Sequence, residues 1–197
     1  VSLGVWVKTG SAYEQEAMNG ISHFFEHTCF KGTKKRNSLQ INEEIEDVGG
    51  QMNAYTSREF TAYYAKMLKA DAELAADVIA DILLNATFPE EELVKEREVV
   101  VQEIKQTIDA PDDIIFDYFQ EAAFPNQALG RSILGPAEKV RSFNGDTLRK
   151  YISTNYAGEN MIACAVGNIE HDSFVKMIEE RMSTLQPQTN FTPEKQI

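Results

Sequence analysis

The residues of this sequence best suited to chemistry are two histidines and a glutamate in one short stretch, His23-Phe24-Phe25-Glu26-His27. On a helix, residues four positions apart share a face, so His23 and His27 can both direct a ring nitrogen at one metal ion. Glu26 lies at the edge of that face, where its carboxylate can approach a metal-bound water and leave the metal to the imidazoles. Two neutral nitrogen ligands beside a carboxylate base meet a requirement of hydrolytic zinc centres. The spacing therefore predicts a metal site on a helix.

A purely structural interpretation of the same stretch is a short amphipathic helix, with Phe24 and Phe25 in the core and the polar residues facing solvent. The chain has only three histidines, and two of them fall at ligand spacing, which favours the metal site. A catalytic zinc also needs a third protein ligand. His171 is one candidate, but it lies where a helix is expected to begin, which favours a surface position.

Better candidates for the third ligand lie on an acid-rich helix predicted over residues 90–109. Glu96 and Glu103 are seven residues apart, so they share one face of this helix, two turns from each other. That face borders an apolar stripe, where a carboxylate is costly unless a cation or hydrogen bonds receive it. An ordinary solvated, glutamate-rich helix is the alternative interpretation. The stripe consists of Leu93, Val100, Ile104 and Ile108.

Helical and strand patterns are mixed along the chain without a regular βαβ alternation. The pattern predicts an α+β fold, with a mixed, largely antiparallel sheet and helices packed on one face. Ser38 is the expected cap of the second helix, and residues 51–56 and 60–68 are expected to form a hairpin. The other expected strands are residues 1–7 and 161–166, and the expected helices are about 20–30, 38–48, 74–83, 90–109, 112–123, 146–156 and one that begins at 171.

Composition excludes several classes of function. The 197 residues carry a net charge of −12, which disfavours nucleic-acid binding because phosphates need a basic face. The longest apolar runs are only a few residues, so no membrane span is expected. The two cysteines, Cys29 and Cys164, lack the spacing of a disulfide scaffold or a zinc ribbon, and both are expected to be reduced and structural.

Several segments, in order, resemble the pitrilysin-type (inverzincin) metallopeptidases, above all their processing-peptidase branch. The resemblance rests on the His-x-x-Glu-His order and on a glutamate 76 residues after His27, and it covers nearly the whole chain. Besides residues 23–33, the matching segments are 49–57, 96–103, 129–135 and 155–169.

The resemblance implies a role for each residue of the predicted site. His23 and His27 would bind zinc, Glu103 would be the third ligand, and one Zn²⁺ would be held per chain. Glu26 would be the general base that takes a proton from the zinc-bound water. Glu96 would be a second catalytic carboxylate, supporting the site by orienting a ligand.

The resemblance also implies the substrate and the domain organisation. Asn53 and Ala54 would line an edge strand to which an extended peptide adds as a further strand. The peptide is expected to be flexible, since it must be extended to pair with a strand, and the processing-peptidase branch implies a basic one. The eleven acidic and three basic side chains of residues 90–121, a net of −8, are consistent with a basic peptide. Residues 1–185 would be a zinc-binding peptidase domain, and 186–197 a linker toward a missing C-terminal half.

The expected function is that of a zinc-dependent endopeptidase half, which needs a homologous second half in the same chain or in a partner subunit. A dimer is the expected assembly, in the cytoplasm for a bacterial protein or in the mitochondrial matrix for a eukaryotic one. The alternative is a non-catalytic structural or peptide-binding subunit of the same fold. The four motif residues that such subunits typically lose are all present: His23, Glu26, His27 and Glu103.

Overall fold

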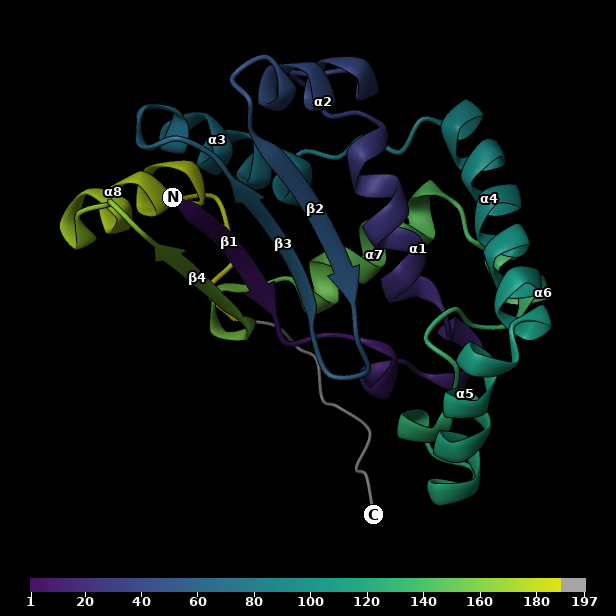
Figure 1. The fold of residues 1–197 in the computed structure, drawn as a ribbon. Helices are drawn as coiled ribbons and strands as arrows, with labels where there is room; N and C mark the ends of the chain where they lie inside the picture. The colour runs from purple at the N-terminus through teal and green to yellow at the C-terminus, as the bar shows by residue number, and fades with distance from the viewer. Residues whose placement is uncertain (189–197) are drawn as a thin grey trace.

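The computed structural model describes residues 1–188, in which the strands form one antiparallel sheet. The strands are β1 (Ser2–Val7), β2 (Gln51–Thr56), β3 (Thr61–Lys66) and β4 (Met161–Val166). Their order across the sheet is β2-β3-β1-β4, and every pairing is antiparallel. β2 and β4 are therefore the edges, although they lie more than 100 residues apart in the chain (Figure 1). This arrangement confirms the predicted α+β class with a largely antiparallel sheet.

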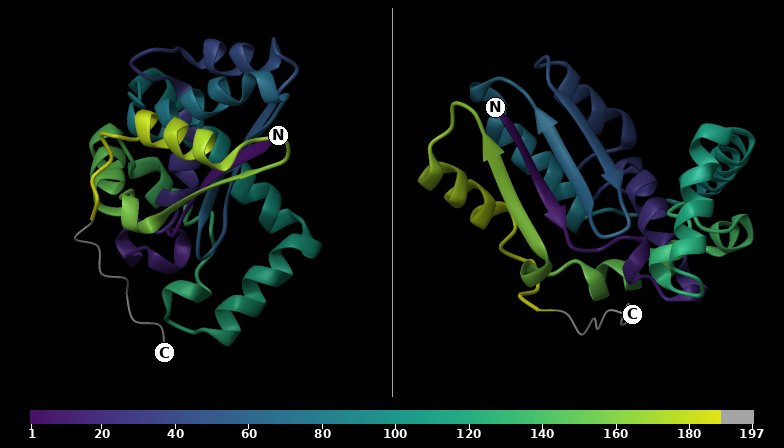
Figure 2. Two further views of the ribbon diagram at one scale, coloured as in Figure 1. Left: turned by 90° about the vertical axis from the view of Figure 1, so that its left-hand side faces the viewer. Right: turned by 60° about the horizontal axis from the view of Figure 1, so that its bottom comes forward.

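Helices cover one face of the sheet, as predicted, and leave the other open (Figures 1 and 2). On the open face, Tyr55, Ile162 and Val166 are exposed. The α-helices within residues 1–188 are α1 (Ile21–Thr28), α2 (Ser38–Glu46), α3 (Ala72–Leu84), α4 (Glu90–Asp109), α5 (Pro111–Ala123), α6 (Ala137–Ser142), α7 (Gly145–Asn155) and α8 (His171–Arg181).

α1 is anchored in the core by its two phenylalanines. Phe24 and Phe25 are fully buried, and the Phe25 ring lies 5.0 Å from that of Tyr156 and 6.3 Å from that of Tyr63 on β3. Burying a large aromatic side chain contributes about 1.5–3 kcal/mol. This packing fixes how α1 is rotated about its axis, and it leaves the opposite face of the helix for the polar residues of the motif.

Three local predictions need correction. The cap of α2 is Asn37 and not Ser38, because the Asn37 side chain accepts from the Gln40 N–H while the Gln40 side chain accepts from the Asn37 N–H. α6 lies in a segment expected to be loop, since its six residues are too few for a visible apolar period. Cys164 is exposed, because β4 alternates and presents it on the open face of the sheet, whereas Cys29 is buried.

Most of the expected linker, residues 189–197, lies outside the described residues. Just before it, the carbonyls of Gln186 and Pro187 accept hydrogen bonds from the N–H groups of Gly158 and Glu159. Between residues 1 and 188, no helix is both long and apolar enough to cross a membrane.

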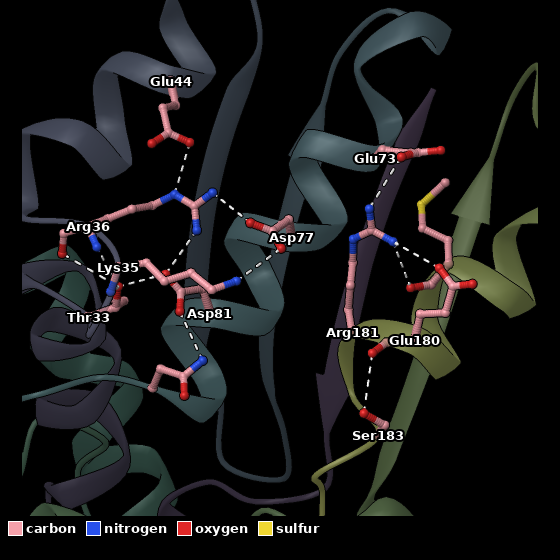
Figure 3. Close-up of polar contacts among 12 residues, drawn as sticks. Thr33, Lys35, Arg36, Glu44, Glu73, Asp77, Asp81, Glu180, Arg181 and Ser183 are labelled. Atoms are coloured by element: carbon pink, nitrogen blue, oxygen red, sulfur yellow. Dashed lines mark hydrogen bonds and ion pairs between the residues drawn. The ribbon is translucent and has the colours of Figure 1, made fainter.

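A partly buried ion-pair cluster holds α2 and α3 to the segment between α1 and α2 (Figure 3). The Arg36 guanidinium donates to Glu44 at 2.9 Å, to Asp77 at 2.6 Å and to Asp81 at 2.9 Å. Asp81 is 2% exposed and also accepts from the Thr33 hydroxyl at 2.6 Å. Every charge in the cluster is paired, which is the condition for keeping charges away from water.

Candidate metal centre

α1 and α4 pack side by side and carry all the predicted metal ligands (Figure 1). α4 begins directly after Pro89 and has three glutamates in its first turn, both favourable at a helix N-terminus. Leu93 and Val100 of its predicted apolar stripe are buried, whereas Ile104 is half-buried and Ile108 is exposed. The apolar stripe therefore attaches α4 to the core from Leu93 to Ile104, and Glu103 lies at the end of the attached part.

The two histidines and Glu103 converge on one point. Oε2 of Glu103 lies 3.6 Å from Nε2 of His23 and 3.4 Å from Nε2 of His27, and one ligand atom from each residue lies within 4.8 Å of the other two. Zinc–ligand distances of about 2.1 Å in a tetrahedron put neighbouring ligand atoms about 3.4 Å apart. The nitrogen–oxygen separations therefore match those around a tetrahedral zinc ion, and the donor set of two imidazoles and one carboxylate suits zinc.

Glu96 lies behind this point. Its Oε2 is 3.2 Å from Nδ1 of His27, the ring nitrogen that faces away from Glu103, and its Oε1 is 2.7 Å from Nζ of Lys31. The Glu96 side chain is nearly buried. An acceptor on Nδ1 holds the proton there and leaves the lone pair on Nε2, the nitrogen that faces the convergence point. The geometry thus separates the two glutamates: Glu103 faces the point, and Glu96 contacts the His27 nitrogen on the far side of the ring.

Glu26 projects from α1 toward the end of β2. Its Oε2 accepts a hydrogen bond of 2.6 Å from the Thr56 hydroxyl, which holds the carboxylate in one position. Burial raises the pKa of Glu26, and the Thr56 hydrogen bond opposes that rise. A carboxyl group whose pKa is raised by burial is a stronger base for taking up a proton near neutral pH.

The two histidines have opposite protonation behaviour. Burial, followed by the charge of His27, lowers the pKa of His23 to about 4, so this ring is neutral at pH 7. Burial also acts to lower the pKa of His27, but the hydrogen bonds that its ring donates to Glu103 and Glu96 outweigh it and raise this pKa to about 9. Glu103 and Glu96 themselves have lowered pKa values, Glu103 chiefly through its hydrogen bond with His27. A metal that bound here would displace the proton from Nε2 of His27.

The predicted substrate residues lie on an edge strand beside the site. Asn53 and Ala54 are in β2, which within residues 1–188 pairs with β3 alone. The Ala54 N–H donates to the Asn53 side-chain oxygen at 2.8 Å, so a polar side chain covers a backbone donor of this edge. β2 also packs against α1, and it ends at Thr56, the partner of Glu26. The edge strand therefore leads directly to the carboxylate of the motif.

Two residues that contact the predicted site residues, Thr56 beside Glu26 and Lys31 beside Glu96, were not given a role from the sequence. Thr56 occupies the last position of a predicted strand, and Lys31 precedes the glycine that ends the first helix; neither position carries a chemical signal by itself. The alternative ligand His171 is exposed at the start of α8, and no contact brings it to the other two histidines.

Comparison with known proteins agrees with this geometry. Residues 1–137 match the insulinase family (peptidase family M16), and residues 142–197 match the M16 inactive domain. The chain belongs to peptidase family M16. The predicted resemblance to pitrilysin-type metallopeptidases is thereby confirmed. The second match contributes β4, which pairs with β1 from the first, so both matched segments build one sheet.

The curated relatives of this M16 chain are bacterial and mitochondrial. It is 48% identical over 180 residues to an uncharacterised zinc protease of Bacillus subtilis, covering 91% of this chain and 44% of that protein. It is 43% identical over 176 residues to the bovine mitochondrial-processing peptidase subunit beta, covering 89% of this chain and 36% of that one. The chain spans less than half the length of these relatives. Their names support a peptidase function, with zinc as the metal, at the level of the family.

Solved structures show the same fold. A protease from Helicobacter pylori superposes with a TM-score of 0.90 at 23% identity, over 100% of this chain and 47% of that one. The periplasmic protease PqqL from Escherichia coli gives 0.88 at 24% identity, over 100% of this chain and 22% of that one.

Proposed function

We propose that this chain is the zinc-binding part of an endopeptidase that hydrolyses extended peptides. The observation that carries the proposal is the convergence of His23, His27 and Glu103 at separations suited to tetrahedral zinc, next to an open edge strand. His23 and His27 supply Nε2 and Glu103 supplies Oε2. Glu96 keeps the His27 ring in the ligating tautomer.

Zinc bound by these residues would acidify a water molecule and polarise the scissile carbonyl. Glu26 takes the proton from the attacking water and returns it to the leaving amine. The Thr56 hydroxyl keeps the Glu26 carboxylate aimed at the same place through both transfers, since it holds one carboxylate oxygen at 2.6 Å.

The peptide binds along β2. In an extended conformation it adds to the free edge of this strand, and its carbonyl oxygen replaces the Asn53 side chain as the acceptor for the Ala54 N–H. The net charge of −8 on residues 90–121, which include α4 and α5, favours basic peptides. Folded proteins are poor substrates because their strands are already paired.

The full activity requires a homologous second half, in the same chain or in a partner subunit, and a dimer is the proposed assembly. Residues 1–185 form the zinc-binding domain of that enzyme. The enzyme would work in the cytoplasm of a bacterium or in the mitochondrial matrix of a eukaryote; its relatives include a bacterial zinc protease and a mitochondrial-processing peptidase subunit.

Metal analysis tests the site, and peptide cleavage tests the reaction. The chain is expected to hold about one zinc, and Glu103→Ala to lose it, whereas Glu98→Ala, an exposed glutamate on the same helix, keeps it. Glu26→Gln is expected to keep the zinc and lower peptide cleavage by about 10²–10⁴-fold, measured with the second half present. Unchanged cleavage in Glu26→Gln would refute the general base. Peptide binding without cleavage in the unmutated protein would favour a non-catalytic peptide-binding subunit.

A further inference from the structure

A buried carboxylate lies against the first turn of α1. Glu14 is 3% exposed, and its oxygens accept hydrogen bonds from the backbone N–H groups of Gly20 and Ser22, both at 2.8 Å, and from the Asn19 side chain at 3.0 Å. The first N–H groups of a helix have no partner within the helix and form its positive end. Gly20 occupies the cap position and has no side chain. Glu14 therefore supplies from upstream the cap that the helix itself lacks.

A second set of buried hydroxyls supports this contact. The Ser22 hydroxyl hydrogen bonds to Glu14 and accepts from the Tyr151 hydroxyl at 2.9 Å, and that hydroxyl lies 3.1 Å from the Thr9 hydroxyl. Burial raises the pKa of Glu14, and the hydrogen bonds that the carboxyl group accepts oppose the rise. The network joins α7 and the loop after β1 to the start of α1.

The segment 131–135 holds the other side of the same turn. The Asn19 side chain donates to the Ser132 carbonyl at 3.0 Å. Gly20 has a φ of +97°, and a side chain there would place its Cβ 2.6 Å from the Leu134 carbonyl oxygen. Only glycine satisfies both the backbone conformation and the close approach. The start of α1 is thus clamped between Glu14 and a segment more than 100 residues downstream.

His23 follows Ser22 directly and depends on this clamp. Its Nδ1 is buried and has no hydrogen-bond partner among residues 1–188, so no acceptor orients the ring as Glu96 orients His27. The position of Nε2 is therefore set by the backbone of the first turn and by packing. We infer that Glu14 is a positioning residue for the proposed zinc site, because its carboxylate fixes the turn that aims His23 at Glu103. This inference rests on the proposed function.

The test compares two buried carboxylates. Glu14→Gln keeps the shape of the side chain but turns an amide NH₂ toward N–H donors. Asp81→Asn is the matched control, since Asp81 is equally buried and accepts from Thr33, Arg36 and Asn85, all outside α1. Both variants are expected to unfold at lower urea concentration than the parent. Only Glu14→Gln is expected to weaken zinc binding, by about 10-fold in competition with a chromophoric chelator, and to change the visible spectrum of the Co²⁺-loaded protein.

The outcomes distinguish failure of the proposed zinc site from failure of the positioning role of Glu14. A parent chain without zinc would overturn the proposed function and this inference together. A parent that binds zinc and a Glu14→Gln variant with the same affinity and the same Co²⁺ spectrum would overturn the inference alone, as would an equal loss in Asp81→Asn. If Glu14→Gln fails to fold, Asn19→Ala removes one of the four groups that donate to the Glu14 carboxylate. A weakening of zinc binding by a few fold is then expected, and parental affinity would refute the inference.

Discussion

The different roles proposed for Glu96 and Glu103 on α4 give the sharpest prediction. Glu103 faces both Nε2 atoms, at 3.6 and 3.4 Å, whereas the histidine nitrogen that Glu96 contacts is Nδ1 of His27, at 3.2 Å. Glu96→Gln keeps a carbonyl oxygen that can accept from Nδ1, but it removes the charge and the ion pair with Lys31. It should therefore weaken the orientation of one ligand without removing a ligand.

The magnitude follows from this geometry. Loss of an outer partner of a metal-bound histidine typically costs about 10–100-fold in metal affinity, which is about 1.4–2.7 kcal/mol. Glu103→Gln replaces a charged ligand by a neutral amide and should exceed this range. The expected order of zinc affinity is parent, then Glu96→Gln, then Glu103→Gln.

A competition titration with a chromophoric chelator measures all three affinities under one set of conditions. Glu98→Gln serves as the control for removing a negative charge from α4, because Glu98 is exposed and its cationic partner is Arg141, 3.6 Å away. It should bind zinc as the parent does. Equal losses in Glu96→Gln and Glu103→Gln would refute the assignment and make Glu96 a ligand. An equal loss in Glu98→Gln would show that the helix charge, and no specific contact, controls the affinity.

Three further predictions concern the base and the ion-pair cluster. Thr56→Val removes a hydrogen bond that lowers the pKa of Glu26, so this pKa should rise further. The acidic limb of the pH profile of kcat/KM should therefore move to higher pH, and an unmoved limb would argue against Glu26 as the base. Arg36→Met leaves the buried Asp81 carboxylate without its cation and should lower the free energy of unfolding by about 3–5 kcal/mol. Urea titration measures this change, and a loss below about 1 kcal/mol would contradict the claim that Asp81 needs a paired cation. Burial acts to raise the pKa of Asp77, but hydrogen bonding and charge from Arg36 outweigh it and hold this pKa below its usual value. The stabilisation is therefore present above about pH 4 and lost as the pH falls further, and Asp77→Asn should flatten the decline of unfolding free energy with acid.

The sequence by itself determined the fold class, most of the helices and strands, and the placement of two histidines and a glutamate on one helix. Periodicity placed α4 at residues 90–109, and the spacing of His23, Glu26 and His27 put three functional groups on one short helix. These features are local: an i, i+4 relation or an apolar repeat fixes its geometry within a few residues, whatever the rest of the chain does. The role of Glu103 came from the resemblance, since the residues alone left the acid-rich helix open to a solvated interpretation.

Only the tertiary structure decided which glutamate faces which nitrogen. Glu96 and Glu103 share one face of α4, and two turns of helix separate them along it, so their roles depend on where α1 crosses that face. The same holds for Glu14 and Thr56, whose partners lie 8 and 30 residues away and give no periodic signal. Contacts of this kind arise from the packing of elements distant in sequence, and that packing depends on how apolar side chains throughout the core fit together.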